Sequence, residues 1–145
     1  LVDVRGLWKA TELASRASGG EWEVRTAPRL SQYIFTDRHY SYMYVPGADP
    51  RKLFAGDADN PTAAEKAEAY NSLVAATGTY TLSGRTLTLS ATVHKNPNEM
   101  VGKPLAYAVE SDGDTDADGD RRPAVLTGSG MAHRAQESRV MTVRR

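Results

Sequence analysis

The feature that most constrains the fold is an alternation of apolar and hydroxyl-bearing residues in the second half of the chain. Residues 86–94 read TLTLSATVH, with leucine, alanine and valine at every second position. Successive side chains of a β-strand point to opposite faces, so this pattern predicts a strand with one buried face. The preceding Ser83-Gly84-Arg85 is typical of a hairpin turn. The sequence therefore predicts an antiparallel sheet.

Further short strands are expected along the whole chain, separated by turn residues such as Thr36-Asp37-Arg38-His39. The expected strands are Val4–Leu13, Trp22–Thr26, Leu30–Phe35, Tyr40–Val45, Thr79–Leu82, Thr86–His94, Pro104–Val109, Ala124–Thr127 and Arg139–Val143. A length of 145 residues fits a single domain over residues 1–145. About eight to ten strands in one domain favour an all-β fold, a closed antiparallel up-and-down β-barrel, because closure removes exposed strand edges. A β-sandwich is the alternative.

One segment, residues 62–76, has a helical pattern instead. Apolar residues recur there at spacings of three and four, which predicts one short amphipathic α-helix. Thr62 with Glu65 forms a capping-box pattern, and Asn60 followed by Pro61 is a second way to begin the helix. Gly78 is expected to stop it. The helix is expected to pack over one end or flank of the barrel through Tyr70, Leu73 and Val74.

Composition excludes several classes of function. Eighteen Lys and Arg residues balance eighteen Asp and Glu residues, and the bases are scattered, which argues against nucleic-acid binding. No apolar run approaches the roughly 20 residues of a membrane span, so a soluble protein is expected. Without cysteine there is no disulfide or thiolate chemistry, and the compartment, cytoplasmic or secreted, stays open. Nucleotide-binding glycine motifs are missing, so no cofactor is predicted. The composition leaves open whether the chain forms a homodimer.

Aromatic residues are the main candidates for a binding site. Tyr40, Tyr42 and Tyr44 share one face of their expected strand, and Tyr33 and Phe35 share a face of the strand before it. If the tyrosine face points inward, it lines a cavity suited to a flat, partly polar organic ligand. Alternatively, these aromatic side chains cover an exterior face of the sheet or contact a partner subunit. Tyr80 and Tyr107 are expected to join whichever face is buried.

His94 is the candidate for catalysis. Strict alternation places it on the face of Thr88, Ser90 and Thr92, where it is a solvated residue or a polar group in a polar cavity. With a tyrosine as acid or base, it would support a cyclase or isomerase reaction in a shaped pocket. The other histidines, His39 and His133, give no metal-binding spacing with it.

An acidic loop, residues 112–120, is the candidate for a metal site. Asp114, Asp116, Asp118 and Asp120 with Gly119 match the first half of a calcium loop. The twelfth position holds Val125 where a calcium loop has glutamate, so a solvated hairpin connection is the preferred interpretation. No other metal site is predicted.

Four short sequence motifs occur in an order that resembles their order in the bacterial lipocalin-like domain family. They are Gly6-Leu7-Trp8, Gly78-Thr79-Tyr80, Asn96-Pro97-Asn98-Glu99-Met100-Val101-Gly102 and Val140-Met141-Thr142-Val143-Arg144. The resemblance implies a calycin-type up-and-down β-barrel with a small-molecule cavity. It also implies that Trp8 packs across the closed end of the barrel beneath a basic side chain, which we match to Arg144.

The sequence thus predicts binding of a small hydrophobic or aromatic molecule in a β-barrel cavity. The alternative is a small β-barrel cyclase or isomerase acting on a hydrophobic biosynthetic intermediate. A structural or interaction module with a filled barrel is the third interpretation.

Overall fold

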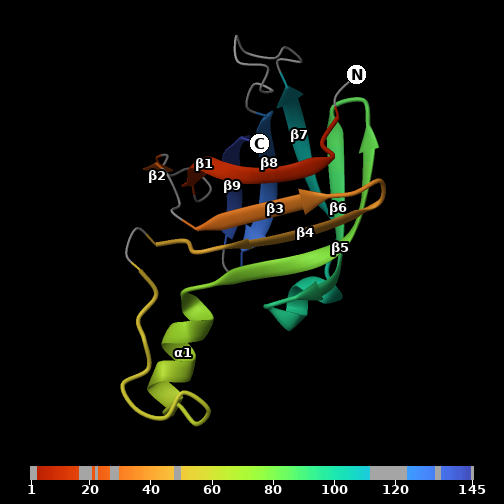
Figure 1. Cartoon of the computed structure of the whole chain (residues 1–145). Helices are drawn as coiled ribbons and strands as arrows, with labels where there is room; N and C mark the ends of the chain where they lie inside the picture. Colours follow the sequence, from red (N-terminus) through yellow and green to blue (C-terminus); the bar gives the residue numbers. More distant parts are fainter. Residues whose placement is uncertain are drawn as a thin grey trace.

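The chain is mostly β, with one short α-helix and a 3-10 turn (Figure 1). The structure, a computed structural model, describes residues 3–16, 21, 23–26, 30–47, 50–111, 124–132 and 135–144, and the side chains of residues 3–9, 21, 30–47 and 50–109. The elements are β1 (Gly6–Arg16), β2 (Glu23–Thr26), β3 (Ser31–Phe35), β4 (His39–Tyr44), α1 (Ala63–Asn71), β5 (Val74–Ser83), β6 (Thr86–His94), η1 (Pro97–Met100), β7 (Leu105–Ser111), β8 (Ala124–Ala132) and β9 (Ala135–Arg144).

Six strands, β1, β3, β4, β5, β6 and β7, form an open half-barrel. Each pairs antiparallel with the next in this order, so the sheet runs up and down and curls around one concave face (Figure 1). The hairpin connections are short, as expected. At the β3–β4 turn the Thr36 amide donates to the His39 carbonyl oxygen at 2.9 Å. At the β5–β6 turn Gly84 has φ +59°, in the left-handed region that glycine adopts without steric cost.

The helix begins where the capping box predicts and ends earlier than expected. The Glu65 amide donates to the Thr62 hydroxyl at 3.3 Å, and the Thr62 amide donates to the Glu65 carboxylate at 2.8 Å. Residues from Val74 on belong to β5, where the chain pairs with β4 through Val74 and with β6 through Ala76. The predicted end at residue 76 and the role of Gly78 as a helix stop are therefore wrong, because strand pairing on both sides overrides the helical pattern.

The helix does not cover the half-barrel. None of its residues is buried, Tyr70 is 47% exposed, and Figure 1 shows α1 projecting from one end of the sheet. Leu73 and Val74 follow the helix, so the expected packing through these three residues is wrong. Instead the loop before the helix holds it: Arg51 donates to the Ala69 carbonyl oxygen at 3.2 Å. Near the other end of the helix, the Ala55 amide donates to Glu65 at 2.8 Å.

The amide bonds to Glu65 also set its protonation. Hydrogen bonds from the amides of Ala55 and then Thr62 hold the pKa of the Glu65 carboxyl below its ordinary value of 4.5. The charged form makes these bonds, so their stabilisation is complete above the ordinary value. It is lost as the pH falls through the lowered pKa.

Replacing the capping threonine is expected to loosen only the helix. Thr62→Ala removes the hydroxyl that accepts the Glu65 amide, so the stability of α1 should fall by about 1 kcal/mol. Amide exchange across residues 63–71 measures this loss. Because no residue of α1 is buried, the midpoint of global unfolding should stay unchanged. Thr81→Ala, an exposed change in β5, should leave the exchange in α1 unaltered. An equal response in both variants would contradict the assignment of the cap.

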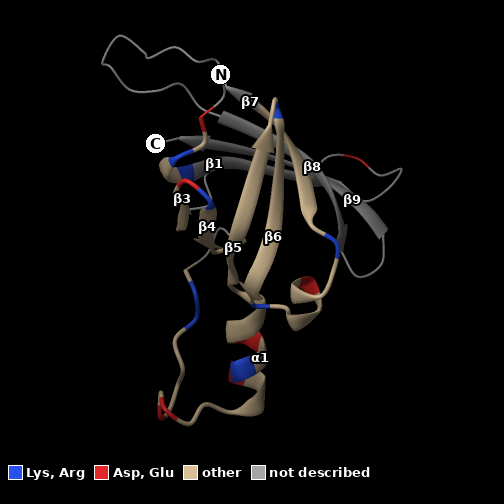
Figure 2. Ribbon diagram, turned by 90° about the vertical axis from the view of Figure 1, so that its right-hand side faces the viewer, with Lys and Arg blue, Asp and Glu red and all other residues tan. Residues whose placement is uncertain are grey.

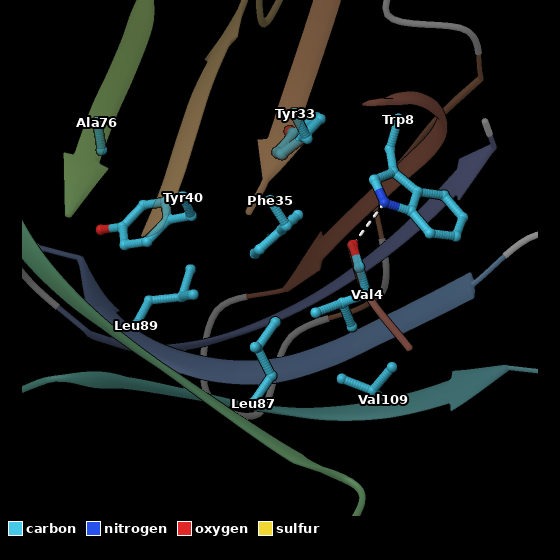
Figure 3. Close-up of a cluster of buried hydrophobic side chains, with 9 residues drawn as sticks. All are labelled: Val4, Trp8, Tyr33, Phe35, Tyr40, Ala76, Leu87, Leu89 and Val109. Carbon is cyan, nitrogen blue, oxygen red and sulfur yellow. Dashed lines mark hydrogen bonds between the residues drawn. The ribbon is translucent and has the colours of Figure 1, made fainter. Parts of the chain in front are cut away.

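The core lies within the curl of the half-barrel (Figure 3). Its largest fully buried side chains are Leu87 and Val109, both 0% exposed. Trp8 is 3% exposed and its indole N–H donates to the Val4 carbonyl oxygen at 2.7 Å, which supports a structural role for this tryptophan. The other buried members of the cluster are Tyr33, Phe35, Tyr40, Ala76 and Leu89.

Candidate functional site

A pocket of about 130 Å³ lies among β4, β6 and the segment that leads from η1 into β7. Tyr40 and Tyr42 of β4 line it, together with Leu89 and His94 of β6. The segment Glu99–Leu105 provides the facing wall. The pocket thus combines two of the predicted ligand-binding tyrosines with the predicted catalytic histidine.

The two tyrosines present stacked rings to this region. Their ring centroids lie 5.8 Å apart with an interplanar angle of 21°. Tyr40 is buried, and this burial raises the pKa of its phenol above the ordinary value of 10.0. The phenol of Tyr40 is therefore protonated at neutral pH and can act as a hydrogen-bond donor.

His94 reaches the pocket because of a β-bulge in β6. Opposite β5, Val93 pairs with Thr77, but Ala91 pairs with Gly78, so Thr92 is an additional residue in β6. The extra residue reverses the alternation beyond it. His94 pairs with the buried Ala76, which also pairs with Tyr42 on its other side. The predicted placement of His94 with Thr88, Ser90 and Thr92 is therefore wrong.

Gly78 is the sequence signal that marks this bulge. A Cβ atom at Gly78 would lie 2.0 Å from the carbonyl oxygen of Ser90, so only glycine fits where the two backbones approach. Glycine inside a strand often indicates a bulge or a close backbone approach. The helical pattern of residues 62–76 assigns Gly78 to the end of a helix, so the sequence alone does not reveal the bulge.

The His94 ring also bonds to Asn96, which begins the η1 turn before the facing wall. Its Nδ1 atom accepts a hydrogen bond from the Asn96 amide at 2.9 Å. A nitrogen that accepts carries a lone pair, so the proton of the neutral imidazole is on Nε2.

Both polar and apolar groups line the pocket. Glu99 is half-buried and Lys103 is exposed, and both contribute to the lining. Figure 2 shows charged positions on η1, on α1 and at loops, and β5 and β6 carry none. Met100, Pro104 and Leu105 add apolar surface. Such a pocket can stack a flat ring on apolar groups and hydrogen-bond its polar edge.

Most of the other predicted binding residues pack against one another rather than around this pocket. The rings of Tyr33 and Tyr42 lie 5.4 Å apart, and those of Tyr33 and Tyr44 lie 6.1 Å apart. Phe35 meets Tyr80 edge to face at 5.3 Å. Tyr107 is half-buried against the core. The tyrosine face thus points inward, in agreement with the first of the two alternatives given by the sequence. Its rings fill part of the interior.

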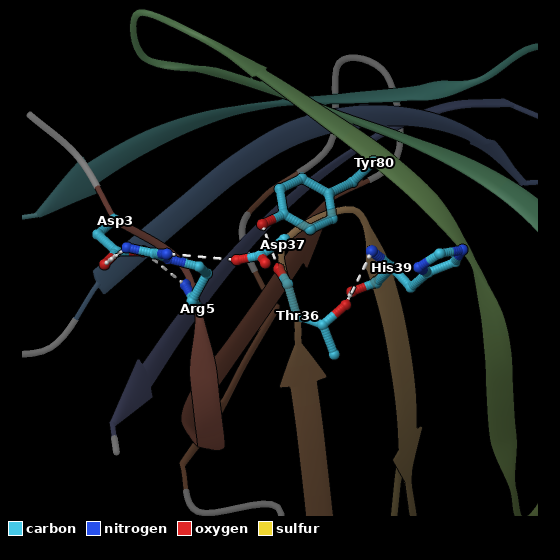
Figure 4. A network of polar contacts seen from close by, with 6 residues as sticks. All are labelled: Asp3, Arg5, Thr36, Asp37, His39 and Tyr80. Carbon is cyan, nitrogen blue, oxygen red and sulfur yellow. Dashed lines mark hydrogen bonds and ion pairs between the residues drawn. The ribbon is translucent and has the colours of Figure 1, made fainter.

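Tyr80 is held by a polar network at the β3–β4 turn (Figure 4). Its hydroxyl donates to the Thr36 carbonyl oxygen at 2.6 Å. Burial, and then the Asp3 carboxylate, raise the pKa of Tyr80 above its ordinary value of 10.0. Arg5 lies between Asp3 at 3.0 Å and Asp37 at 3.3 Å. These contacts give Tyr80 a structural role at the turn.

Several predicted features fall outside the described residues. They are the calcium candidates Asp114, Asp116, Asp118 and Asp120, the histidine His133 and the side chain of Arg144. Among the residues that the structure does describe, no group of three His, Cys, Asp or Glu side chains is placed to hold a metal ion. In that same part of the chain, no helix is long and apolar enough to cross a membrane.

Comparisons of the chain with protein-family models, with curated proteins and with solved structures found no match. The lipocalin-like resemblance therefore remains a prediction from its sequence motifs.

Proposed function

We propose that the chain binds a small hydrophobic or aromatic molecule in the pocket lined by Tyr40, Tyr42 and His94. The observation that carries this proposal is the convergence of two stacked tyrosine rings and one imidazole on a single pocket. The polar groups of such a pocket can fix the orientation of a ligand, while the rings supply contact area.

The volume limits the size of the ligand. A cavity of roughly 150 Å³ lined by apolar side chains is large enough for benzene. At about 130 Å³, this pocket matches a molecule with a single ring. The ligand class is therefore a one-ring aromatic compound with a polar substituent that meets His94 or the Tyr40 hydroxyl.

We also propose that the half-barrel is part of a closed, lipocalin-like β-barrel. This proposal is supported by antiparallel backbone pairing of β7 with β8, of β8 with β9, and of β9 with β1. In this arrangement Leu126 lies opposite both Val109 and Met141, and Met141 lies opposite Leu13. Closure would leave the pocket at one end of the barrel and the Trp8 cluster within it.

The first experiment is native mass spectrometry of the purified protein, which should detect a co-purified molecule of one-ring size. The second is a titration of isotope-labelled protein with phenol, followed by amide chemical shifts. We expect shifts in β4, in residues 89–94 and in residues 99–105. Tyr42→Leu should weaken phenol binding by about three- to ten-fold, because it removes one stacking ring while keeping an apolar side chain.

Tyr70→Leu is the matched control, since Tyr70 is exposed on α1 and lies outside the pocket lining. It should leave the affinity for phenol unchanged. Thermal unfolding of both variants checks that each is folded. Equal losses of affinity in the two variants, or phenol-induced shifts confined to other regions, would exclude this pocket as the binding site.

A cyclase or isomerase is the second candidate, favoured by the presence of the Tyr40 phenol and the His94 imidazole in one pocket. The protonated phenol would serve as the acid. His94 Nδ1 already accepts the Asn96 amide, so a base role would require that bond to break. Conversion of a co-purified molecule by the protein, lost in His94→Phe, would favour the enzyme. Recovery of the co-purified molecule without chemical change would favour binding alone.

A further inference from the structure

A hydrogen bond joins the pocket histidine to Asn96, the residue that begins the η1 turn before the facing wall. The Asn96 amide donates to Nδ1 of His94 at 2.9 Å. Imidazolium carries a proton on both ring nitrogens and accepts no hydrogen bond. The bond therefore exists only while the imidazole is neutral, and protonation of His94 breaks it.

Asn96 begins the η1 turn, so its bond to His94 holds the residue from which the turn is built. The Asn96 side chain accepts the Asn98 amide at 3.1 Å, and its carbonyl oxygen accepts the Glu99 amide at 3.1 Å. Residues Glu99 and Met100 of the same turn line the pocket, as does Lys103 beyond it.

The rest of the segment is anchored by bonds that do not titrate. On one side, the Lys95 amide donates to the Ala75 carbonyl oxygen at 2.8 Å. On the other side, Leu105 pairs with Leu89 in the sheet. Breaking the His94–Asn96 bond thus removes one contact that holds residues 96–104, while the sheet on both sides of the segment keeps its bonds.

We propose that the His94–Asn96 hydrogen bond is a pH-dependent closure of the pocket, and that protonation of His94 loosens residues 96–104 and promotes ligand release. The release step depends on the proposed function, whereas the loosening of the segment does not. An unperturbed histidine changes its charge between about pH 5 and pH 8, which sets the pH values of the test.

The charged and titratable neighbours of His94 come from each element around it. Glu99 of η1 and Lys103 carry opposite charges and line the same pocket as His94. Tyr40 and Tyr42 contribute phenols from β4, and β5 contributes only Ala76 at the paired position. Next along the chain, Lys95 places its ammonium over the Tyr70 ring, 4.1 Å from the centroid.

Amide exchange and amide chemical shifts at pH 7.5 and pH 5 test the closure without any ligand. The protection factor of the Asn96 amide should fall about five-fold on acidification, the effect of losing one hydrogen bond. The amides of residues 97–103 should shift with the same midpoint as the His94 ring resonances, and the β5–β6 amides should stay constant.

His94→Asn is the matched control. An asparagine side chain accepts an amide two residues later without titrating, as Asn96 itself does with Asn98. This variant should keep the Asn96 amide protected at both pH values, and His94→Phe should lose protection at both. An Asn96 amide that is insensitive to pH in the wild type, or an unchanged pH response in His94→Asn, would overturn the proposal.

Phenol binding at the same two pH values separates the closure from the proposed function. We expect the dissociation constant of the wild type to rise about five-fold at pH 5, and that of His94→Asn to stay constant. If phenol binds at neither pH, the proposed function is wrong and the amide measurements alone decide the closure. If the segment loosens but phenol binds equally at both pH values, the release step is wrong.

Discussion

A Gly78→Ala substitution is expected to lower the free energy of unfolding by about 3 kcal/mol or more, a larger effect than alanine at Gly56, Gly84 or Gly102. The new Cβ atom would lie 2.0 Å from the Ser90 carbonyl oxygen and 2.9 Å from the Thr92 nitrogen. Both are backbone atoms of β6, so no side-chain rotation relieves the overlap. The two strands must separate at the bulge, which breaks their hydrogen bonds. Chemical denaturation followed by tryptophan fluorescence measures the change.

Gly56→Ala is the control for this prediction. A Cβ atom at Gly56 has no neighbour within 4 Å, so this change should alter the free energy of unfolding by less than about 0.5 kcal/mol. Losses of the same size at both glycines would mean that the backbones of β5 and β6 do not approach closely at Gly78. The placement of His94 in the pocket would then lose its structural basis.

The parts of the fold that the sequence predicts correctly are those with a local physical cause. The alternation of residues 86–94 gives a strand, and Gly84 marks its turn. The Thr62 and Glu65 pair begins the helix because the two side chains cap the first amides reciprocally. Each of these signals lies within a few residues of the structure that it predicts.

The parts that the sequence does not predict depend on contacts between distant segments. The helical pattern continues through Val74, but the backbone there pairs with Tyr44, thirty residues earlier, and so becomes a strand. The face of His94 likewise depends on one extra residue, Thr92, which has no partner of its own in β5. The pocket therefore follows from strand register, which the alternation of a single strand does not fix.

A Leu87→Ala substitution should lower the free energy of unfolding by about 3 kcal/mol. Leu87 is 0% exposed and lies in the cluster with Val109 inside the half-barrel. Truncation removes apolar contacts and leaves a cavity that close-packed neighbours fill only in part. Denaturant titration with an unchanged slope would assign the loss to the native state. Leu53→Ala, at a position 88% exposed, should change stability by less than about 0.5 kcal/mol.

The size of the Leu87 effect also distinguishes a packed interior from an open one. A leucine facing an open cavity already lacks neighbours on one side, so its truncation costs little beyond the transfer of its own methyl groups. A leucine enclosed on all sides loses packing as well. A loss confined to this transfer free energy would mean that Leu87 lacks neighbours on one side, and the ligand cavity would then extend into the core. A large loss confines the cavity to the pocket beside Tyr40, Tyr42 and His94.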